Sequence, residues 1–166
     1  APAILRLLFS PGVPGDGDAG VCNLEPYHLH YGHITDPVTG EAIDEVLAVP
    51  VPSPRTYTRQ DVVEIDAHGG IVAVRRILTL CLERGARLAE PGEFTLRAFL
   101  NGRIDLAQAE AVLDVVRAKT DQALQTAVGQ LAGRLSERVR SVRALLLDLL
   151  AHVEAGKRFH DEDVAA

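Results

Sequence analysis

A long amphipathic stripe in the second half of the chain constrains its fold more than any other feature. Thr120 and Asp121 are typical of a helix start, and apolar side chains then recur at helical spacing as far as Gly156. The stripe consists of Leu124, Ala127, Leu131, Leu135, Val139, Val142, Leu146, Leu149 and Val153. This pattern predicts one helix of roughly 35 residues, about 50 Å long at 1.5 Å per residue. A core built from 166 residues cannot bury such a rod, so we expect an arm that needs further packing partners.

A second helix is predicted just before this arm. Asp105 is placed to cap it, with Gln108 at the third helical position, and the apolar spacing continues to about Lys119. The change of texture that precedes these helices falls at Pro91 and Gly92. We assign residues 92–166 to a partial helical domain.

The residues before Pro91 have a different texture, with short elements and frequent Gly and Pro. A loop is expected from Pro11 to Gly20. Alternation of apolar and polar residues over Tyr27–Tyr31 predicts a half-buried strand, which the turn Pro37–Gly40 would pair with a second strand over Ile43–Val49.

The same region continues with a third strand and a helix. Val63 and Ile65 alternate with polar residues, and His68–Gly70 ends that strand before a helix from Ile71 to about Arg84. Short strands mixed with helices predict an α+β fold. We assign residues 1–91 to this domain.

Composition excludes several functions. The formal net charge of −6 argues against a domain that grips nucleic acid unaided, because neutralising phosphates needs clustered Lys and Arg. Cys22 and Cys81 stand alone, and neither a secretory leader nor a membrane-length apolar run occurs, so a cytoplasmic protein is expected. His28, His30 and His33 lack completing ligands, so we predict no metal site. The start at Ala1, rather than Met, suggests a segment of a longer protein.

Several blocks of residues carry a family resemblance. They are Tyr31–Ile34, Ile43–Leu47, Arg55–Thr58, Asp61–Ile65 and His68–Gly70, followed by the longer blocks Gly85–Thr95, Arg97–Leu106 and Gln108–Ala111. In order and spacing the chain resembles the bacterial tRNA-modification GTPase family called MnmE or TrmE. A block of this length is far more specific than a short motif.

The resemblance implies a fold and a function. It implies a small tetrahydrofolate-binding-like domain and a helical arm, from a potassium-dependent GTPase that modifies the wobble uridine of tRNA. Members of the family form homodimers through the N-terminal domain, work with an FAD-containing partner called MnmG or GidA, and bind formyl-tetrahydrofolate as a one-carbon donor.

This sequence departs from the family pattern in important respects. It contains no G-x-x-x-x-G-K-[ST] motif, so the segment has no phosphate loop and no predicted catalytic residue of its own. GTP, magnesium and potassium would bind a G domain that is absent here. The family's opening strand would precede Ala1, and Lys157 and Arg158 depart from the usual residues near the end.

Glu64 and Arg103 match family positions that contact the folate. A carboxylate such as Glu64 can accept both adjacent N–H donors of a pterin edge, and Arg103, where the family has Lys, can pair with ligand oxygens. The alternatives are a solvated strand carboxylate and a surface arginine. His68, Gly69 and Gly70 precede a predicted helix, whose free N–H groups favour polar ligands; a simple tight turn is an equal alternative.

Two other functions compete with this assignment. The first is a stand-alone folate enzyme of the aminomethyltransferase type, which would have no need of the helical arm. The second is a purely structural dimerisation module. Arg134, Arg138, Arg140 and Arg143 could present a basic strip to tRNA, although Glu137 among them favours a solvated face.

Overall fold

The structure, a computed structural model, describes residues 1–12 and 24–163. It divides into two compact units, Ala1–Arg103 and a second unit that begins at Ile104, whereas the sequence placed the division after residue 91. The expected loop from Pro11 to Gly20 lies outside the described residues after Gly12, as does Cys22. None of the helices in the described ranges combines the length and apolar content needed to cross a membrane.

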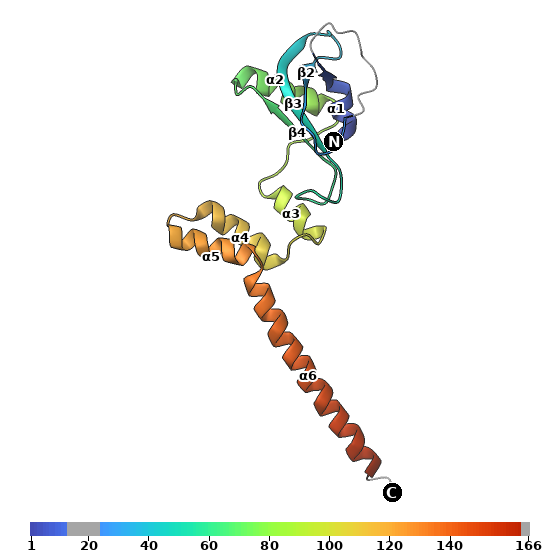
Figure 1. Cartoon of the computed structure of the whole chain (residues 1–166), viewed down its shortest axis with the longest axis vertical. Helices are drawn as coiled ribbons and strands as arrows, with labels where there is room; N and C mark the ends of the chain where they lie inside the picture. The colour runs from blue at the N-terminus through green and yellow to red at the C-terminus, as the bar shows by residue number, and fades with distance from the viewer. Residues whose placement is uncertain (13–23, 164–166) are drawn as a thin grey trace. The chain divides into compact units, whose positions relative to one another are not determined.

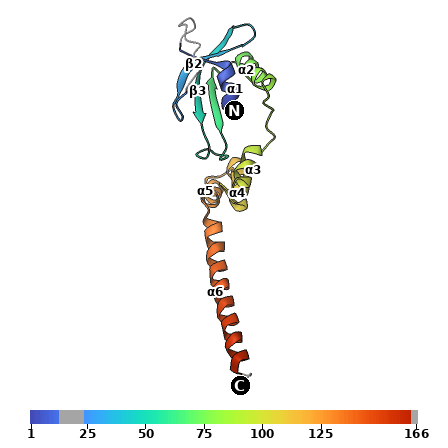
Figure 2. The same cartoon turned by 90° about the vertical axis from the view of Figure 1, so that its right-hand side faces the viewer.

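The first unit is built on a four-stranded antiparallel sheet. The strands are β1 (Phe9–Pro11), β2 (His30–Thr35), β3 (Ala42–Val51) and β4 (Val62–Ala67), in the order β1-β2-β3-β4 (Figures 1 and 2). The predicted pairing of the second and third of these strands is confirmed, with Gly32 opposite Val46. Two backbone hydrogen bonds close the turn between these strands. The Asp36 N–H donates to the Glu41 carbonyl, and the Gly40 N–H donates to the Asp36 carbonyl.

Two helices cover one face of this sheet. α1 (Pro2–Leu8) and α2 (Ile71–Glu83) lie on the same side of the strands in Figure 2. Together with the sheet they enclose the core, which consists of Leu5, Leu8, Phe9, Ile34, Val46, Ala48, Ile77 and Leu80. The predicted α+β fold is therefore confirmed. Gly85 ends α2 with φ +95°, a conformation that favours glycine.

The opposite face of the sheet is uncovered by these helices. Because side chains alternate along a strand, Glu64 points away from the core that Val63 and Ile65 enter. The register places Glu64 opposite Val49, and Tyr31 and Leu47 lie on the same outer face, both partly exposed.

The strand predicted to begin at Tyr27 is wrong in its first residues. Tyr27 has φ +63° and lies in a turn, and β2 begins at His30. The backbone N–H of Tyr27 donates to Pro50 at 2.9 Å, and its hydroxyl donates to Pro52 at 3.1 Å. Tyr27 therefore closes the end of β3 instead of extending the ladder, and His28 and His30 do not share a strand face.

A helix that the sequence did not predict completes the first unit. α3 (Glu93–Leu100) begins after Gly92, which has φ +78°. The carboxylate of Glu93 accepts hydrogen bonds from Arg87 at 2.8 Å and from Arg97 at 3.0 Å. Hydrogen bonds from Arg87, from the Glu90 backbone N–H and from Arg97, in that order of effect, lower the pKa of Glu93 to about 2.

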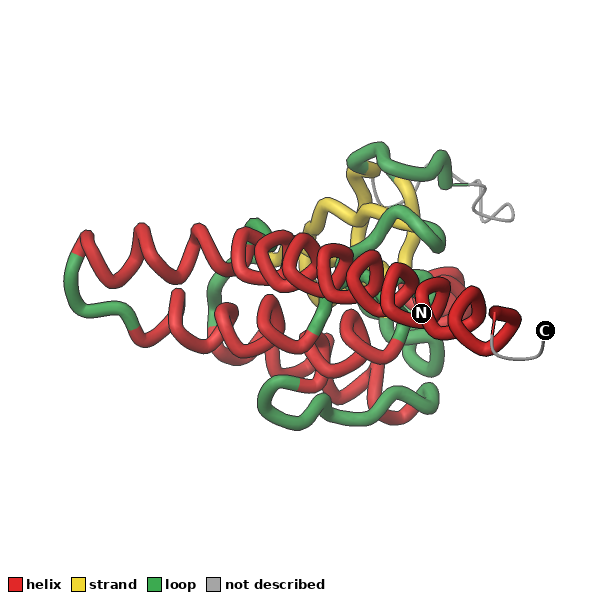
Figure 3. The backbone as a smooth tube through the Cα atoms, turned by 90° about the horizontal axis from the view of Figure 1, so that it is seen from below, coloured by secondary structure: helices red, strands yellow, loops and turns green. Residues whose placement is uncertain are grey.

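The second unit opens with an antiparallel helical hairpin. α4 (Leu106–Arg117) and α5 (Asp121–Leu131) lie side by side, joined by the loop 118–120 (Figures 1 and 3). The predicted capping box is confirmed, because Asp105 and Gln108 exchange two hydrogen bonds of 3.0 Å. Thr120 caps α5 by accepting from the Ala123 N–H at 3.1 Å.

The single rod predicted from Thr120 to Gly156 is wrong. The helix breaks at Gly133, which has φ +86°, and α6 (Arg134–Asp163) then runs for 30 residues, about 45 Å, past Gly156. Gln108 donates to the Leu131 carbonyl at 2.9 Å and so satisfies one orphan group at the break. The apolar side chains of α6 from Val139 to Val153 are exposed, as expected of an arm that lacks its partners.

Candidate functional site

Glu64 lies in the middle of β4 on the uncovered face of the sheet. Its side chain is exposed, and among the described residues its carboxylate makes no hydrogen bond or ion pair. The backbone on both sides is held in the ladder with β3, so the position of the carboxylate is set by a rigid element. Glu64 therefore presents free acceptor oxygens from a fixed strand.

Arg103 lies in a depression formed by the β3–β4 loop. Its guanidinium stacks over the Tyr57 ring, 4.7 Å from the ring centroid, in a cation–π contact. The depression has a volume of about 430 Å³ and is lined by Pro54, Arg55, Thr56, Tyr57, Arg59 and Arg103. Three of these residues are cations and none is acidic. The local potential is therefore positive, although the chain as a whole is acidic.

The loop that carries these arginines is tied down at several points. The Ser53 hydroxyl donates to the Arg59 carbonyl at 3.0 Å, and the Asp61 carboxylate accepts from the Ser53 N–H at 2.9 Å. Asn101, just after α3, donates to the Thr58 carbonyl at 2.6 Å. These bonds fix the loop, including Arg59, which has the unusual φ of +56°.

His68 is engaged within the protein. The backbone N–H of His68 donates to one carboxylate oxygen of Asp44 at 2.9 Å, and the ring Nδ1 of His68 lies 2.9 Å from the other oxygen. The hydrogen bond and the charge of Asp44 raise the pKa of His68. Gly69 and Gly70 lie in open space, and α2 begins after Gly70 without a side-chain cap. His68 thus secures the end of β4 through its backbone N–H and Nδ1, while its ring stays largely exposed beside the two open glycines and the first turn of α2.

The structure places the sequence-predicted residues at three points of the first unit. Glu64 is in β4, His68–Gly70 follows the end of β4, and Arg103 lies beside the loop that precedes β4. Sequence reasoning missed Arg55 and Arg59 as neighbours of Arg103. Their signal was the run Arg55-Thr-Tyr-Thr-Arg59, in which two cations flank an aromatic residue.

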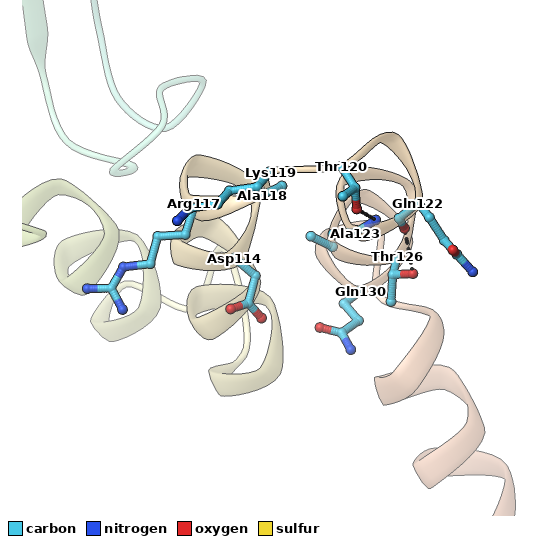
Figure 4. A pocket seen from close by; sticks show the side chains of 10 residues that line it. Asp114, Arg117, Ala118, Lys119, Thr120, Gln122, Ala123, Thr126 and Gln130 are labelled. Atoms are coloured by element: carbon cyan, nitrogen blue, oxygen red, sulfur yellow. Dashed lines mark hydrogen bonds between the residues drawn. The ribbon is translucent and has the colours of Figure 1, made fainter.

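Other cavities offer less for a site. A cavity of about 420 Å³ beside α1 and β4 is lined mainly by apolar residues, and its polar part consists of Thr58, Gln60, Asp61 and the Glu93 ion pairs. In the second unit, an open depression between α4 and α5 is lined by polar residues of mixed charge, among them Asp114, Arg117 and Lys119 (Figure 4). Within the described ranges, His, Cys, Asp and Glu form no group of three or more that could hold a metal ion.

The basic strip considered for tRNA lies in α6, and its four arginines are exposed. Arg134 and Arg138 line a depression together with glutamines of α5, and Arg140 donates to the Ser136 carbonyl at 3.2 Å. Arg143 is also exposed. These positions suit a solvated helix face, and a contact with RNA stays a prediction.

Together, these features define a two-part protein: an α+β domain with an open sheet face, followed by a helical module. Residues 8–103 match the family model described as "GTP-binding protein TrmE N-terminus", and residues 106–166 match the one described as "MnmE helical domain". The chain belongs to the MnmE (TrmE) family.

Three relatives illustrate the similarity, and each is named tRNA modification GTPase MnmE. The Geobacter sulfurreducens protein is 55% identical over 164 residues, which cover 99% of this chain and 34% of the relative. The Bacillus velezensis protein is 58% identical over 139 residues, which cover 84% of this chain and 30% of the relative. The Bacillus subtilis protein is 54% identical over 141 residues, which cover 85% of this chain and 31% of the relative. The chain therefore spans about a third of the length of these relatives.

Proposed function

We propose that this chain is the folate-binding and dimerising part of a GTPase that modifies the wobble uridine of tRNA in the cytoplasm. In this proposal, GTP, magnesium and potassium bind a G domain that the sequence does not contain, and an FAD-containing partner of the MnmG or GidA type completes the reaction. The names of the relatives and the match to both family models support the proposal.

The exposed carboxylate of Glu64 is the observation that carries the folate assignment. A pterin edge offers adjacent N–H donors, which a carboxylate accepts as a charge-assisted pair. Glu64 has both oxygens free among the described residues and is held by the β3–β4 ladder. The free oxygens and the fixed strand position support the assignment of Glu64 as a pterin anchor. When bound, formyl-tetrahydrofolate would supply a one-carbon unit.

The other predicted residues fit the ligand to different degrees. Arg103 has a positive environment suited to the acidic tail of a folate. Gly69 and Gly70 leave room for close approach of a ligand, since no atom would lie within 4 Å of an added Cβ. His68 fits less well, because its backbone N–H and its Nδ1 are both bonded to Asp44 and only the other ring nitrogen faces a ligand.

The experiment is calorimetry with formyl-tetrahydrofolate on the full-length protein and its Glu64→Gln variant. The substitution keeps the size of the side chain but turns one acceptor into a donor that faces another donor. Losing the paired contact should cost about 2–4 kcal/mol, a factor of roughly 30 to 1,000 in Kd. Glu110→Gln is the control, because it removes an exposed carboxylate from α4. Equal affinity of Glu64→Gln and wild type would remove Glu64 from the site.

We further propose that the protein is a homodimer and that the N-terminal unit, not the helical arm, mediates the contact. The family resemblance supports this, and the partly exposed Tyr31 and Leu47 on the uncovered sheet face are compatible with it. Sedimentation at tens of micromolar protein, an order-of-magnitude choice for an interface of standard size, tests it. A monomer under those conditions would count against the proposal.

A further inference from the structure

The arginine depression contains more positive charge than the fold itself uses. Arg55, Arg59 and Arg103 are all exposed and line one depression together with Tyr57, and none of its lining residues is acidic. Like charges held close together repel one another. A cluster of this kind is stabilised when an anion with several negative groups binds it.

Two of the three guanidinium groups are already oriented. Arg103 is stacked on Tyr57, whose hydroxyl lies 3.3 Å from the Thr95 hydroxyl. Arg59 donates from one Nη to the Asn101 carbonyl at 3.1 Å, which leaves most of its five N–H donors available. Because these side chains are positioned before a ligand arrives, binding loses less side-chain entropy.

The position of the depression suggests which anion it binds. The loop that carries Arg55 and Arg59 joins β3 to β4, and Glu64 lies two residues into β4, about 7 Å along the strand from Val62. The acidic tail of a folate whose pterin contacts Glu64 can therefore extend toward this loop. A volume of about 430 Å³ suits part of a small molecule.

A nucleic-acid backbone is a poorer fit. Binding along a phosphate backbone uses a longer track of cations, on the order of 6–10 phosphate contacts, and this depression has three arginines on a chain of net charge −6. The local cluster matches a few carboxylates at the end of a small ligand.

We propose that Arg55, Arg59 and Arg103 bind the carboxylates of the glutamyl tail of the folate, so that the protein prefers folates with longer poly-γ-glutamyl tails. Each added glutamyl residue contributes one more carboxylate, and guanidinium groups pair well with carboxylates. This inference rests on the proposed function, because the pterin must be anchored at Glu64.

The test compares mono- and triglutamyl formyl-tetrahydrofolate by calorimetry on the full-length protein. In the wild type the triglutamyl form should bind about 5–10-fold more tightly, from two further solvent-exposed ion pairs, and the gain should shrink at high salt. Arg55→Gln and the double variant with Arg59→Gln should reduce this gain, because each should weaken the triglutamyl form more than the monoglutamyl form. Arg75→Gln, which removes an exposed cation from α2, should keep the full gain.

The outcomes separate this inference from the folate assignment. If tail length makes no difference while Glu64→Gln still weakens the monoglutamyl form, the arginine site is wrong and the proposed function stands. If the Arg55-dependent gain with tail length persists while Glu64→Gln weakens neither folate, the anion site stands and the pterin assignment at Glu64 fails. If the arginine variants instead lose only tRNA affinity, the depression is an RNA contact and the proposal is wrong. Arg55 makes no hydrogen bond to the described residues, so Arg55→Gln should fold normally.

Discussion

Gly32 should be unable to accept even one additional methyl group. It lies in β2 between Pro11 of β1 and Val46 of β3. A Cβ at this position would be 2.6 Å from Cζ and 2.8 Å from Cε2 of Phe9, and nearer still to the carbonyl oxygen of Ser10. The Ser10 oxygen belongs to the backbone and cannot rotate away, so β1 must move in Gly32→Ala.

The structure sets the size of the effect. Forcing a methyl group into packed surroundings costs about 1–3 kcal/mol. If β1 separates from the sheet instead, Phe9, which is only 5% exposed, loses its burial, worth about 1.5–3 kcal/mol. Either route predicts a loss of about 3 kcal/mol or somewhat less from the free energy of unfolding.

Gly69→Ala is the matched control. No atom lies within 4 Å of the position of its Cβ, and the residue is exposed. The same chemical change there should leave stability within about 0.5 kcal/mol or raise it slightly, by restricting the unfolded chain. Urea unfolding of both variants, with hydrogen exchange of the β1 and β2 amides, measures the difference. Equal stability of Gly32→Ala and Gly69→Ala would refute the close approach of β1 to Gly32.

Three further predictions concern charged groups. The pKa of Glu93 is lowered from 4.5 to about 2, so the stability that its ionised carboxylate contributes is complete above about pH 4.5 and is lost as the pH falls toward 2. The free energy of unfolding measured against pH should lack this acid-dependent loss in Glu93→Gln. The hydrogen bond to Asp44 raises the pKa of His68, so the stability from this pair is present below the ordinary histidine pKa and is lost as the pH rises through the raised value. In Asp44→Asn, NMR titration should show that the pKa of His68 has fallen. Asp105→Ala removes the capping box and should cost about 1 kcal/mol in thermal unfolding, and no change would contradict the observed cap.

The candidate site shows how far sequence reasoning reaches. The alternation around Val63 and Ile65 was enough to place Glu64 on the polar face of a strand, because the side-chain period of a strand is two. The neighbours of Arg103 were not predictable in the same way. Arg55 and Arg59 reach it because a loop bends back on hydrogen bonds to Asn101, some forty positions later in the chain.

Local signals in the sequence determined most of the elements. Capping at Asp105 and Thr120, the turn after Asp36 and the end of α2 at Gly85 all depend on residues within a few positions, so they were predicted correctly. The tertiary structure decided what depends on distant partners. Tyr27 leaves its strand pattern to bond to Pro50 and Pro52, and the helix ends at Gly133 where Gln108 satisfies the Leu131 carbonyl. The helical spacing of apolar residues continues across Gly133, so the sequence alone does not show whether this glycine lies inside a helix or ends one. The hydrogen bond from Gln108 of α4 to the Leu131 carbonyl, which depends on the tertiary structure, marks the end of the helix.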